Sequence, residues 1–117
     1  RLTAYAEDSL NKSPWFLYNN IYYQGQAWHS VSHSGKAITD SQTFSNKAAF
    51  AMSVIFQDEY SQNLAIQVMT NSARHQEVPT GLYRDGKTNT AYNINTNSLI
   101  LVSLWYKIRG RKAIWQE

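Results

Sequence analysis

The chain has 117 residues, a net charge of +3 and no cysteine. These values fit one domain and exclude disulfides, thiol catalysis and zinc–cysteine sites. Hydrophobic residues make up 43% and charged residues 16%, so we expect a folded module and not a disordered segment. No run of about 18 apolar residues occurs, which predicts that nothing spans a membrane.

The first element is expected to be a helix from residue 1 to about residue 11. Leu2, Tyr5, Ala6 and Leu10 recur at helical spacing. The pair Ser13-Pro14 then ends the pattern, as proline commonly does.

A long loop rich in aromatic residues is expected from Ser13 to Phe44, with a possible short strand at residues 28–33. Periodicity is poor there, and Gly25 and Gly35 punctuate the stretch. Loops of this length are often functional. The alternative is that the aromatic rings form a small core that holds the loop in place.

Two helices are predicted next. Ser45 is a suitable N-cap for a helix at residues 46–57, and Asp58 can cap a second helix that runs to about Ala73. The helix at residues 46–57 is apolar nearly all round, which is typical of a helix buried on most sides. We therefore expect a partner chain, or a region N-terminal to this sequence, to pack on it.

A loop with a tight turn at residues 84–87 is predicted before the last helix, which Asn95 or Asn97 would cap. Gly110 suits the end of that helix. Basic residues near the C-terminus are interpreted as helix-end charge, so no nucleic-acid partner is expected. The stripe expected to be buried consists of Ile100, Leu101, Leu104, Trp105 and Ile108. The predicted fold is thus mainly α, with about four helices in helical hairpins joined by long aromatic and polar loops.

Candidates for catalysis are few. His29 and His33 lack an evident third ligand, so we expect no metal site, and no phosphate-binding glycine loop indicates a cofactor. Glycoside hydrolysis requires two carboxyl groups at one bond. We select Asp85 and Glu77 as catalytic candidates, although Asp85 is also explained as a turn residue.

Contact with a sugar is the better supported hypothesis. Sugars present flat apolar faces to aromatic rings and hydroxyl groups to amides. Trp15, Tyr18 and Trp28 supply the rings, and Asn95 and Asn97 supply amides near a helix start. The alternative for these asparagines is that they cap the helix and bind loop backbone.

Three stretches resemble the bacterial DUF3131 family. The first is the turn Leu82-Tyr83-Arg84-Asp85-Gly86, followed by Asn95-Thr96-Asn97 and a helix that ends in Tyr106-Lys107-Ile108-Arg109-Gly110. The second is the segment from Phe44 to Phe50, and the third is the segment from Pro14 to Tyr22. The matches lie in order and cover residues 14 to about 110. Family motif positions are occupied by Tyr83, Asp85, Asn95, Asn97 and Lys47. On this resemblance we also select Tyr83 as a candidate sugar-binding residue.

This resemblance implies a relationship to glucoamylase-like (α/α)-toroid proteins and a periplasmic or cell-envelope location. The family's N-terminal half has no counterpart here, so residues 1–117 would be one module, the C-terminal portion of a larger (α/α) domain. We expect part of a bacterial glycoside hydrolase-like protein acting on a glucan or exopolysaccharide. The alternatives are a non-catalytic glycan-binding module and a structural assembly module.

Overall fold

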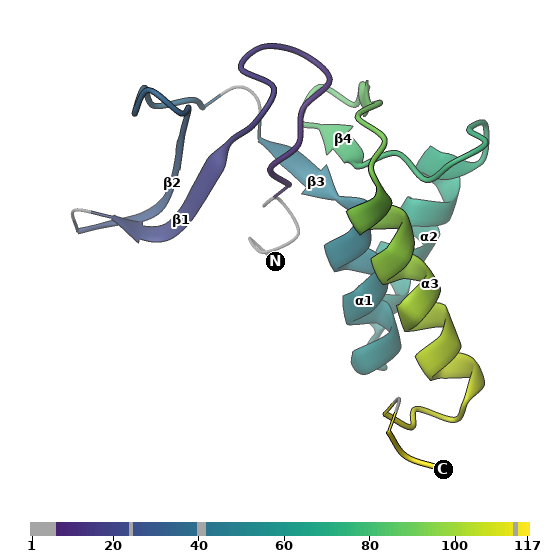
Figure 1. Cartoon of the computed structure of the whole chain (residues 1–117). Coiled ribbons are helices and arrows are strands. Elements are labelled where there is room, and N and C mark those ends of the chain that lie inside the picture. Colours follow the sequence, from purple (N-terminus) through teal and green to yellow (C-terminus); the bar gives the residue numbers. More distant parts are fainter. Residues whose placement is uncertain (1–6, 24, 40–41, 114) are drawn as a thin grey trace.

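The computed structural model describes residues 7–23, 25–39, 42–113 and 115–117, without the side chains of residues 20–23 and 26–29. The described part has three helices and two small antiparallel sheets (Figure 1), which is an α/β fold. The expected mainly α fold of about four helices in hairpins is therefore wrong. The main reason is that the first 45 residues contribute strands where a helix and a loop were predicted.

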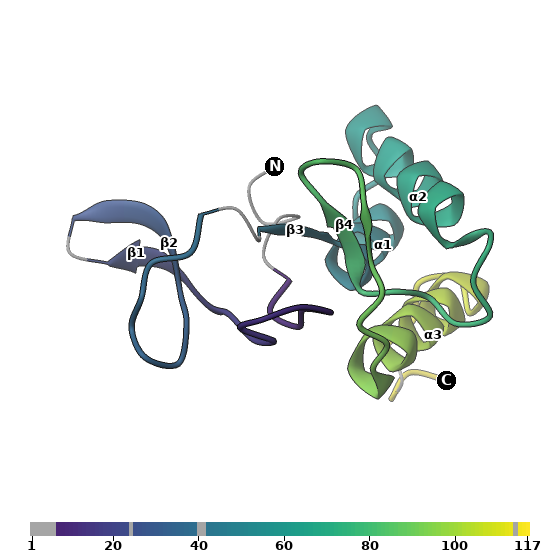
Figure 2. The same cartoon turned by 90° about the horizontal axis from the view of Figure 1, so that it is seen from above.

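Strands β1 (Tyr18–Tyr23) and β2 (Gln26–Val31) form an antiparallel hairpin within the predicted loop. Only a short strand at residues 28–33 had been anticipated, and β2 overlaps it. Tyrosine and isoleucine dominate β1, and both favour extended backbone. Figure 2 shows the hairpin at one end of the molecule, away from the helices.

The second sheet has the order β3-β4-β5, with β3 at Thr43–Ser45, β4 at Gly81–Tyr83 and β5 at Thr88–Asn89. It requires glycine at position 81, because a Cβ there would lie 1.6 Å from the Phe44 carbonyl oxygen. The predicted turn at residues 84–87 connects β4 to β5, and this sheet places the N-terminus of α1 directly after β3.

Helices α1 (Asn46–Ile55) and α2 (Glu59–Ser72) begin where the sequence predicted. Ser45 Oγ accepts a hydrogen bond from Ala48 N, and Asp58 Oδ1 accepts one from Ser61 N at 2.8 Å. Both side chains thereby satisfy a backbone donor that the first helical turn leaves open.

Helix α3 (Ile94–Ile108) is capped by Asn93, whose Oδ1 accepts from Thr96 N at 2.8 Å. The prediction of Asn95 or Asn97 as the cap is therefore wrong by two or four residues. At the other end Gly110 has a φ of 69° and donates to the Lys107 carbonyl, while Arg111 N donates to the Tyr106 carbonyl. This is the pattern of a Schellman C-cap, so the predicted helix end is confirmed.

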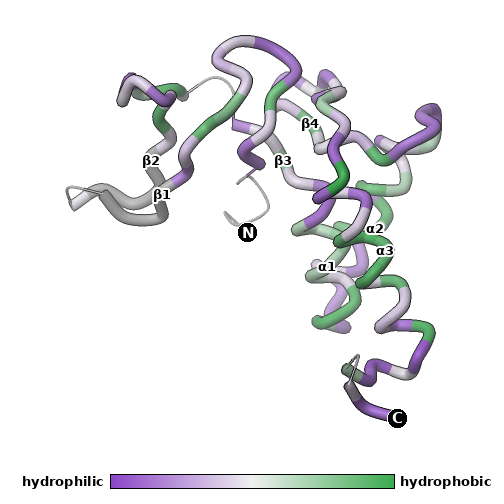
Figure 3. The backbone as a smooth tube through the Cα atoms, viewed as in Figure 1, coloured by the Kyte–Doolittle hydropathy of each residue, from purple (hydrophilic) through white to green (hydrophobic). Residues whose placement is uncertain are grey.

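Helix α1 packs against both α2 and α3, and the three helices run side by side (Figure 1). The core beneath it joins the sheet to the helices and consists of Phe44, Ala49, Leu64 and Val68. The stripe predicted to be buried on α3 is largely exposed, with Leu101 at 65% and Ile108 at 67%. No described helix is long and apolar enough to cross a bilayer. Figure 3 shows hydrophobic residues recurring along α1 and α3.

Residues 7–17 are not helical, which contradicts the second half of the helix predicted for residues 1–11; residues 1–6 lie outside the described part. Ser9 and Phe16 form an antiparallel bridge, and Leu17 N donates to the Asp8 carbonyl at 2.8 Å. Leu10 and Leu17 pack with Tyr83 in a second small core. The segment is therefore an irregular hairpin that contacts Tyr83 of β4 and Asn89 of β5.

Candidate functional site

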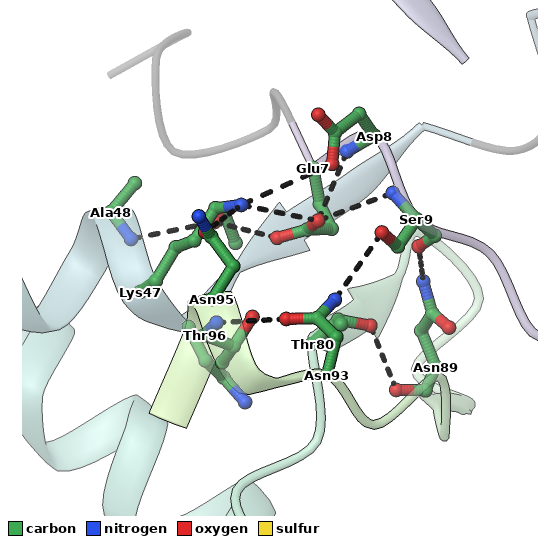
Figure 4. A network of polar contacts seen from close by, with 12 residues as sticks. Glu7, Asp8, Ser9, Lys47, Ala48, Thr80, Asn89, Asn93, Asn95 and Thr96 are labelled. Atoms are coloured by element: carbon green, nitrogen blue, oxygen red, sulfur yellow. Dashed lines mark hydrogen bonds and ion pairs between the residues drawn. The ribbon is translucent and has the colours of Figure 1, made fainter. Parts of the chain in front are cut away.

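Buried amide groups hold residues 9–11 against the C-terminal half of the chain. Asn89 is fully buried, donates to the Ser9 carbonyl at 2.7 Å and accepts from the Asn11 amide N–H at 3.1 Å. Tyr83 Oη donates to Asn11 Oδ1 at 2.6 Å, and Asn93 Nδ2 donates to Ser9 Oγ at 3.3 Å. These bonds span more than 70 residues of sequence and fix the two acidic residues that precede Ser9 (Figure 4).

Glu7 and Asp8 meet the N-terminal ends of α1 and α3, and we call Glu7, Asp8, Lys47 and Asn95 the acid–lysine cluster (Figure 4). Lys47 Nζ lies 3.7 Å from Glu7 Oε1 and 3.9 Å from Asp8 Oδ1. It also donates to Asn95 Oδ1 at 2.9 Å. Lys47 and Asn95 are each the second residue of their helices, so the geometry of the two helix starts brings them together.

Glu7 is almost completely enclosed. Its Oε1 accepts from the backbone N–H groups of Asp8 and Ser9, and its Oε2 accepts from Ser45 Oγ at 3.1 Å. Desolvation by burial raises the pKa of this carboxyl group, and the neighbouring Asp8 side chain raises it further. The positive charge of Lys47 and the hydrogen bond from Ser9 act in the opposite direction, but burial is the larger effect.

Asp8 and Lys47 give the cluster its access to solvent, because their side chains are 42% and 20% exposed while that of Glu7 is not exposed. The cluster thus has one enclosed carboxyl group with a raised pKa, one accessible carboxylate and one ammonium group. Pairs of carboxyl groups in different environments can take different protonation states at one pH.

Exposed aromatic rings follow on the same irregular hairpin. Leu17 N donates to the Asp8 backbone carbonyl, so Tyr18 follows directly after the residue that pairs with Asp8. Tyr18 is 52% exposed and its ring meets that of Phe16 edge to face, with centroids 5.1 Å apart. Trp15 is 65% exposed and has a φ of 68°, an uncommon conformation for a bulky residue.

The other residues selected from the sequence as sugar-binding are placed differently. Tyr83 is buried in the second core with its hydroxyl group bound to Asn11. Asn97 accepts from Val78 N and donates to the Val78 and Asn93 carbonyls, so it holds the loop before α3. Trp28 belongs to β2, and its side chain lies outside the described part of the structure.

The two residues selected as catalytic lie outside the acid–lysine cluster. Asp85 is an exposed residue of the turn between β4 and β5, where its Oδ1 accepts from Lys87 N at 2.9 Å and its Oδ2 lies 4.0 Å from Lys87 Nζ. Glu77 is exposed in the loop between α2 and β4. Their catalytic role stays a prediction.

Sequence reasoning missed Glu7 and Asp8, because both fell within the helix expected at residues 1–11. Lys47 and Asn95, which the structure places beside them, stand at family motif positions. Their shared place in the family motifs was the available signal that the two helix starts form one site.

Residues 1–110 match the model of a family described as proteins of unknown function (DUF3131). The chain belongs to this family. No curated protein and no solved structure matches the chain significantly. The match covers both the acid–lysine cluster and the helix starts that build it, so the site lies entirely within the family region.

Proposed function

We propose that this DUF3131 chain is a carbohydrate-handling part of a glycoside hydrolase-like protein of the bacterial cell envelope, acting on a glucan or exopolysaccharide. In this proposal Trp15 and Tyr18 stack on sugar rings, while Asp8, Lys47 and Asn95 bind sugar hydroxyl groups. The relationship of the family to glucoamylase-like proteins is part of the same proposal.

The observation that supports it is that the segment carrying the exposed rings pairs through its backbone with Asp8, a member of a solvent-accessible set of donors and acceptors. A sugar hydroxyl group both donates and accepts, and Asp8 accepts, Lys47 donates and Asn95 does both. Tyr18 directly follows Leu17, whose backbone N–H donates to the Asp8 carbonyl. Aromatic residues also bury large apolar areas at small entropic cost.

Hydrolysis would require the cluster to supply proton transfer as well as contacts. Asp8 is the carboxylate that can reach a substrate, and Glu7 below it holds a proton more readily because burial raises its pKa. Glu7 is then a positioning residue that acts through Asp8. An active pair at Asp85 and Glu77 is the competing assignment.

Titration calorimetry with glucan and exopolysaccharide oligosaccharides tests the binding proposal. Tyr18→Ala should weaken binding about tenfold, because losing an aromatic anchor commonly costs more than about 1 kcal/mol. Tyr60→Ala is the matched control, since Tyr60 is an exposed tyrosine on α2. No heat from any oligosaccharide, or an equal loss in the control, would refute the proposal.

Hydrolysis of bacterial glucans separates the two catalytic assignments. Asp8→Asn should abolish product release if the acid–lysine cluster is catalytic, while the double variant Asp85→Asn/Glu77→Gln should retain it. The reverse pattern would return catalysis to Asp85 and Glu77. Binding without hydrolysis in every variant and in the wild-type chain would identify a non-catalytic glycan-binding module.

A second function, the docking of a partner helix, is favoured by the exposed stripe of α3. Ile94, Leu101 and Ile108 are seven residues apart and 84%, 65% and 67% exposed. This spacing repeats on one side of a helix and is the pattern of a helix–helix seam. The expected packing surface thus shifts from the helix at residues 46–57, which α2 and α3 cover, to α3.

The partner of this stripe is proposed to be an acidic amphipathic helix, because the end of α3 is basic. Lys107, Arg109, Arg111 and Lys112 gather at that end. A second copy of the chain packed in parallel would bring these charges together. An antiparallel copy would place them at the start of α3, where residues 93–98 contain no acidic side chain.

Two peptides with heptad repeats test this docking. Both have leucine and isoleucine at the seam positions, and they differ only in the flanking positions, which are glutamate in one peptide and lysine in the other. The glutamate peptide should bind the chain, and Leu101→Ser should remove binding. Ile66→Ser, on the exposed side of α2, is the matched control. Equal binding of both peptides, or a stable homodimer in light scattering, would contradict the assignment.

A further inference from the structure

An open pocket of about 590 Å³ lies between the turn at residues 12–14 and the loop that follows β2. Its volume falls within the range of small-molecule sites. Of the described lining residues, none is acidic, two are lysines and four carry hydroxyl groups. The lining residues are Lys12, Ser13, Pro14, Ser32, His33, Ser34, Lys36, Ala37, Ile38 and Thr39.

The positive charge of this pocket is partly held in place. Lys12 Nζ lies 4.3 Å from the centroid of the Tyr83 ring, which favours the ammonium group over the ring face. Tyr83 is itself fixed, because the ring is buried and its hydroxyl group donates to Asn11 Oδ1. A charge that is ordered before binding loses less conformational entropy when a ligand arrives.

The hydroxyl groups across the pocket belong to an ordered turn. Ser32 N donates to the Lys36 carbonyl and Gly35 N donates to the Ser32 carbonyl, both at 2.9 Å. Ser32 Oγ lies 2.9 Å from Ser34 Oγ and accepts from Lys36 N at 3.3 Å. This network fixes the turn that carries Lys36, the second lysine of the lining.

Trp15 links the pocket to the proposed sugar-binding surface. It directly follows the lining residue Pro14 and is mostly exposed. A pyranose ring against Trp15 would therefore lie at the edge of a cationic, hydroxyl-rich pocket. A neutral sugar would gain little from two lysines, whereas a carboxylate would meet opposite charge, and the lining that the structure describes contains no acidic residue.

We propose that this pocket binds the carboxylate of a uronic acid residue, so that the ligand is an acidic polysaccharide. The inference rests on the proposed carbohydrate function and specifies its substrate class. The Lys12 and Lys36 ammonium groups bind the carboxylate, Ser32 and Ser34 bind neighbouring sugar hydroxyl groups, and Trp15 supports the ring.

The test compares a uronic acid oligosaccharide with its methyl ester, which keeps the ring and removes the charge. The free acid should bind at least about tenfold more tightly than the ester, and added salt should reduce this difference. Lys36→Gln should remove most of the preference. Lys107→Gln, which changes the net charge equally outside the pocket, should leave it intact.

The outcomes separate the two levels of the proposal. If neither oligosaccharide nor any neutral glucan binds, the carbohydrate function itself fails. If acid and ester bind equally, or if Lys107→Gln reduces the preference as much as Lys36→Gln, the carbohydrate function stands and the uronate pocket is refuted. If the Lys36→Gln variant and a Lys12→Gln variant both keep the preference for the free acid, the uronate pocket is refuted as well.

Discussion

Removal of the Asn89 side chain should release the segment that carries the acid–lysine cluster. Asn89 is fully buried, donates to the Ser9 carbonyl, and accepts from the backbone N–H groups of Asn11 and Ala91 at 3.1 Å each. Asn89→Ala leaves these three backbone groups without their partner. Each such loss costs about 1–3 kcal/mol, and the partly exposed groups regain some hydration. We expect unfolding to become easier by about 2–4 kcal/mol.

Urea unfolding of the wild type, Asn89→Ala and Thr90→Ala measures this effect. Thr90 Oγ1 accepts a single exposed hydrogen bond, from Asn11 Nδ2, so its loss should cost less than about 1 kcal/mol. Tryptic cleavage after Lys12 under native conditions gives a local readout, and it should accelerate about tenfold or more in Asn89→Ala. Equal stability of the two variants, with unchanged cleavage, would show that Asn89 does not hold this segment.

Three further predictions concern the pH dependence, the sheet and the exposed tryptophan. Burial raises the pKa of Glu7 above its ordinary value of 4.5. The contribution of Glu7 to the free energy of unfolding is therefore complete when the pH is below that ordinary value, and it is lost as the pH rises through the folded-state pKa. Glu7→Gln should remove this loss, and urea titrations from about pH 4 to pH 8 should give a flatter stability profile than the wild type. Gly81→Ala should lower the melting temperature far more than Gly86→Ala, because the first Cβ would overlap the Phe44 carbonyl whereas the second meets open space and only a positive φ of 86°; equal shifts would contradict the close approach of β3 and β4. Trp15→Gly should weaken oligosaccharide binding without lowering the free energy of unfolding, since glycine accepts the φ of 68° at no steric cost; a clear loss of stability in denaturant would make Trp15 a structural residue.

The helix starts were predictable because their signals are local. Ser45 and Asp58 each stand just before an apolar helical pattern, and a side-chain oxygen at that position has a defined partner three residues on. The start of α3 was harder, since asparagines at positions 93, 95 and 97 are all suitable caps. Only the extended backbone of Asn93 decides between them.

The strands were missed because their pairing is not local. Tyrosine and isoleucine before Gly25, with Trp28 and Val31 after it, were a usable signal for the β1–β2 hairpin, but the weak alternation suggested only a short strand. The segment at residues 7–17 gave the wrong signal, since Leu10 fitted a helical spacing. Its conformation instead depends on bonds to Asn89 and Tyr83, more than 70 residues away. The error concealed Glu7 and Asp8 as site residues.

The asparagines around the start of α3 can be separated by the hydrogen bonds that they already make. Asn89, Asn93 and Asn97 use both their amide oxygen and their amide nitrogen within the fold. Asn95 accepts from Lys47, and its amide nitrogen has no described partner. Of these four, Asn95 is therefore the one whose amide nitrogen makes no described hydrogen bond, whereas Asn97 uses its amide nitrogen for two bonds within the fold.

This division predicts opposite results for two substitutions of the same kind. Asn95→Ala should reduce oligosaccharide affinity and change the free energy of unfolding by less than about 1 kcal/mol, because its bond to Lys47 is exposed. Asn97→Ala should cost about 1–3 kcal/mol, because it leaves the Val78 N–H and carbonyl groups unpaired. It should bind sugar normally at temperatures where it is folded. Calorimetry and urea unfolding on both variants decide the matter, and a loss of stability in Asn95→Ala equal to that in Asn97→Ala would make Asn95 another structural amide.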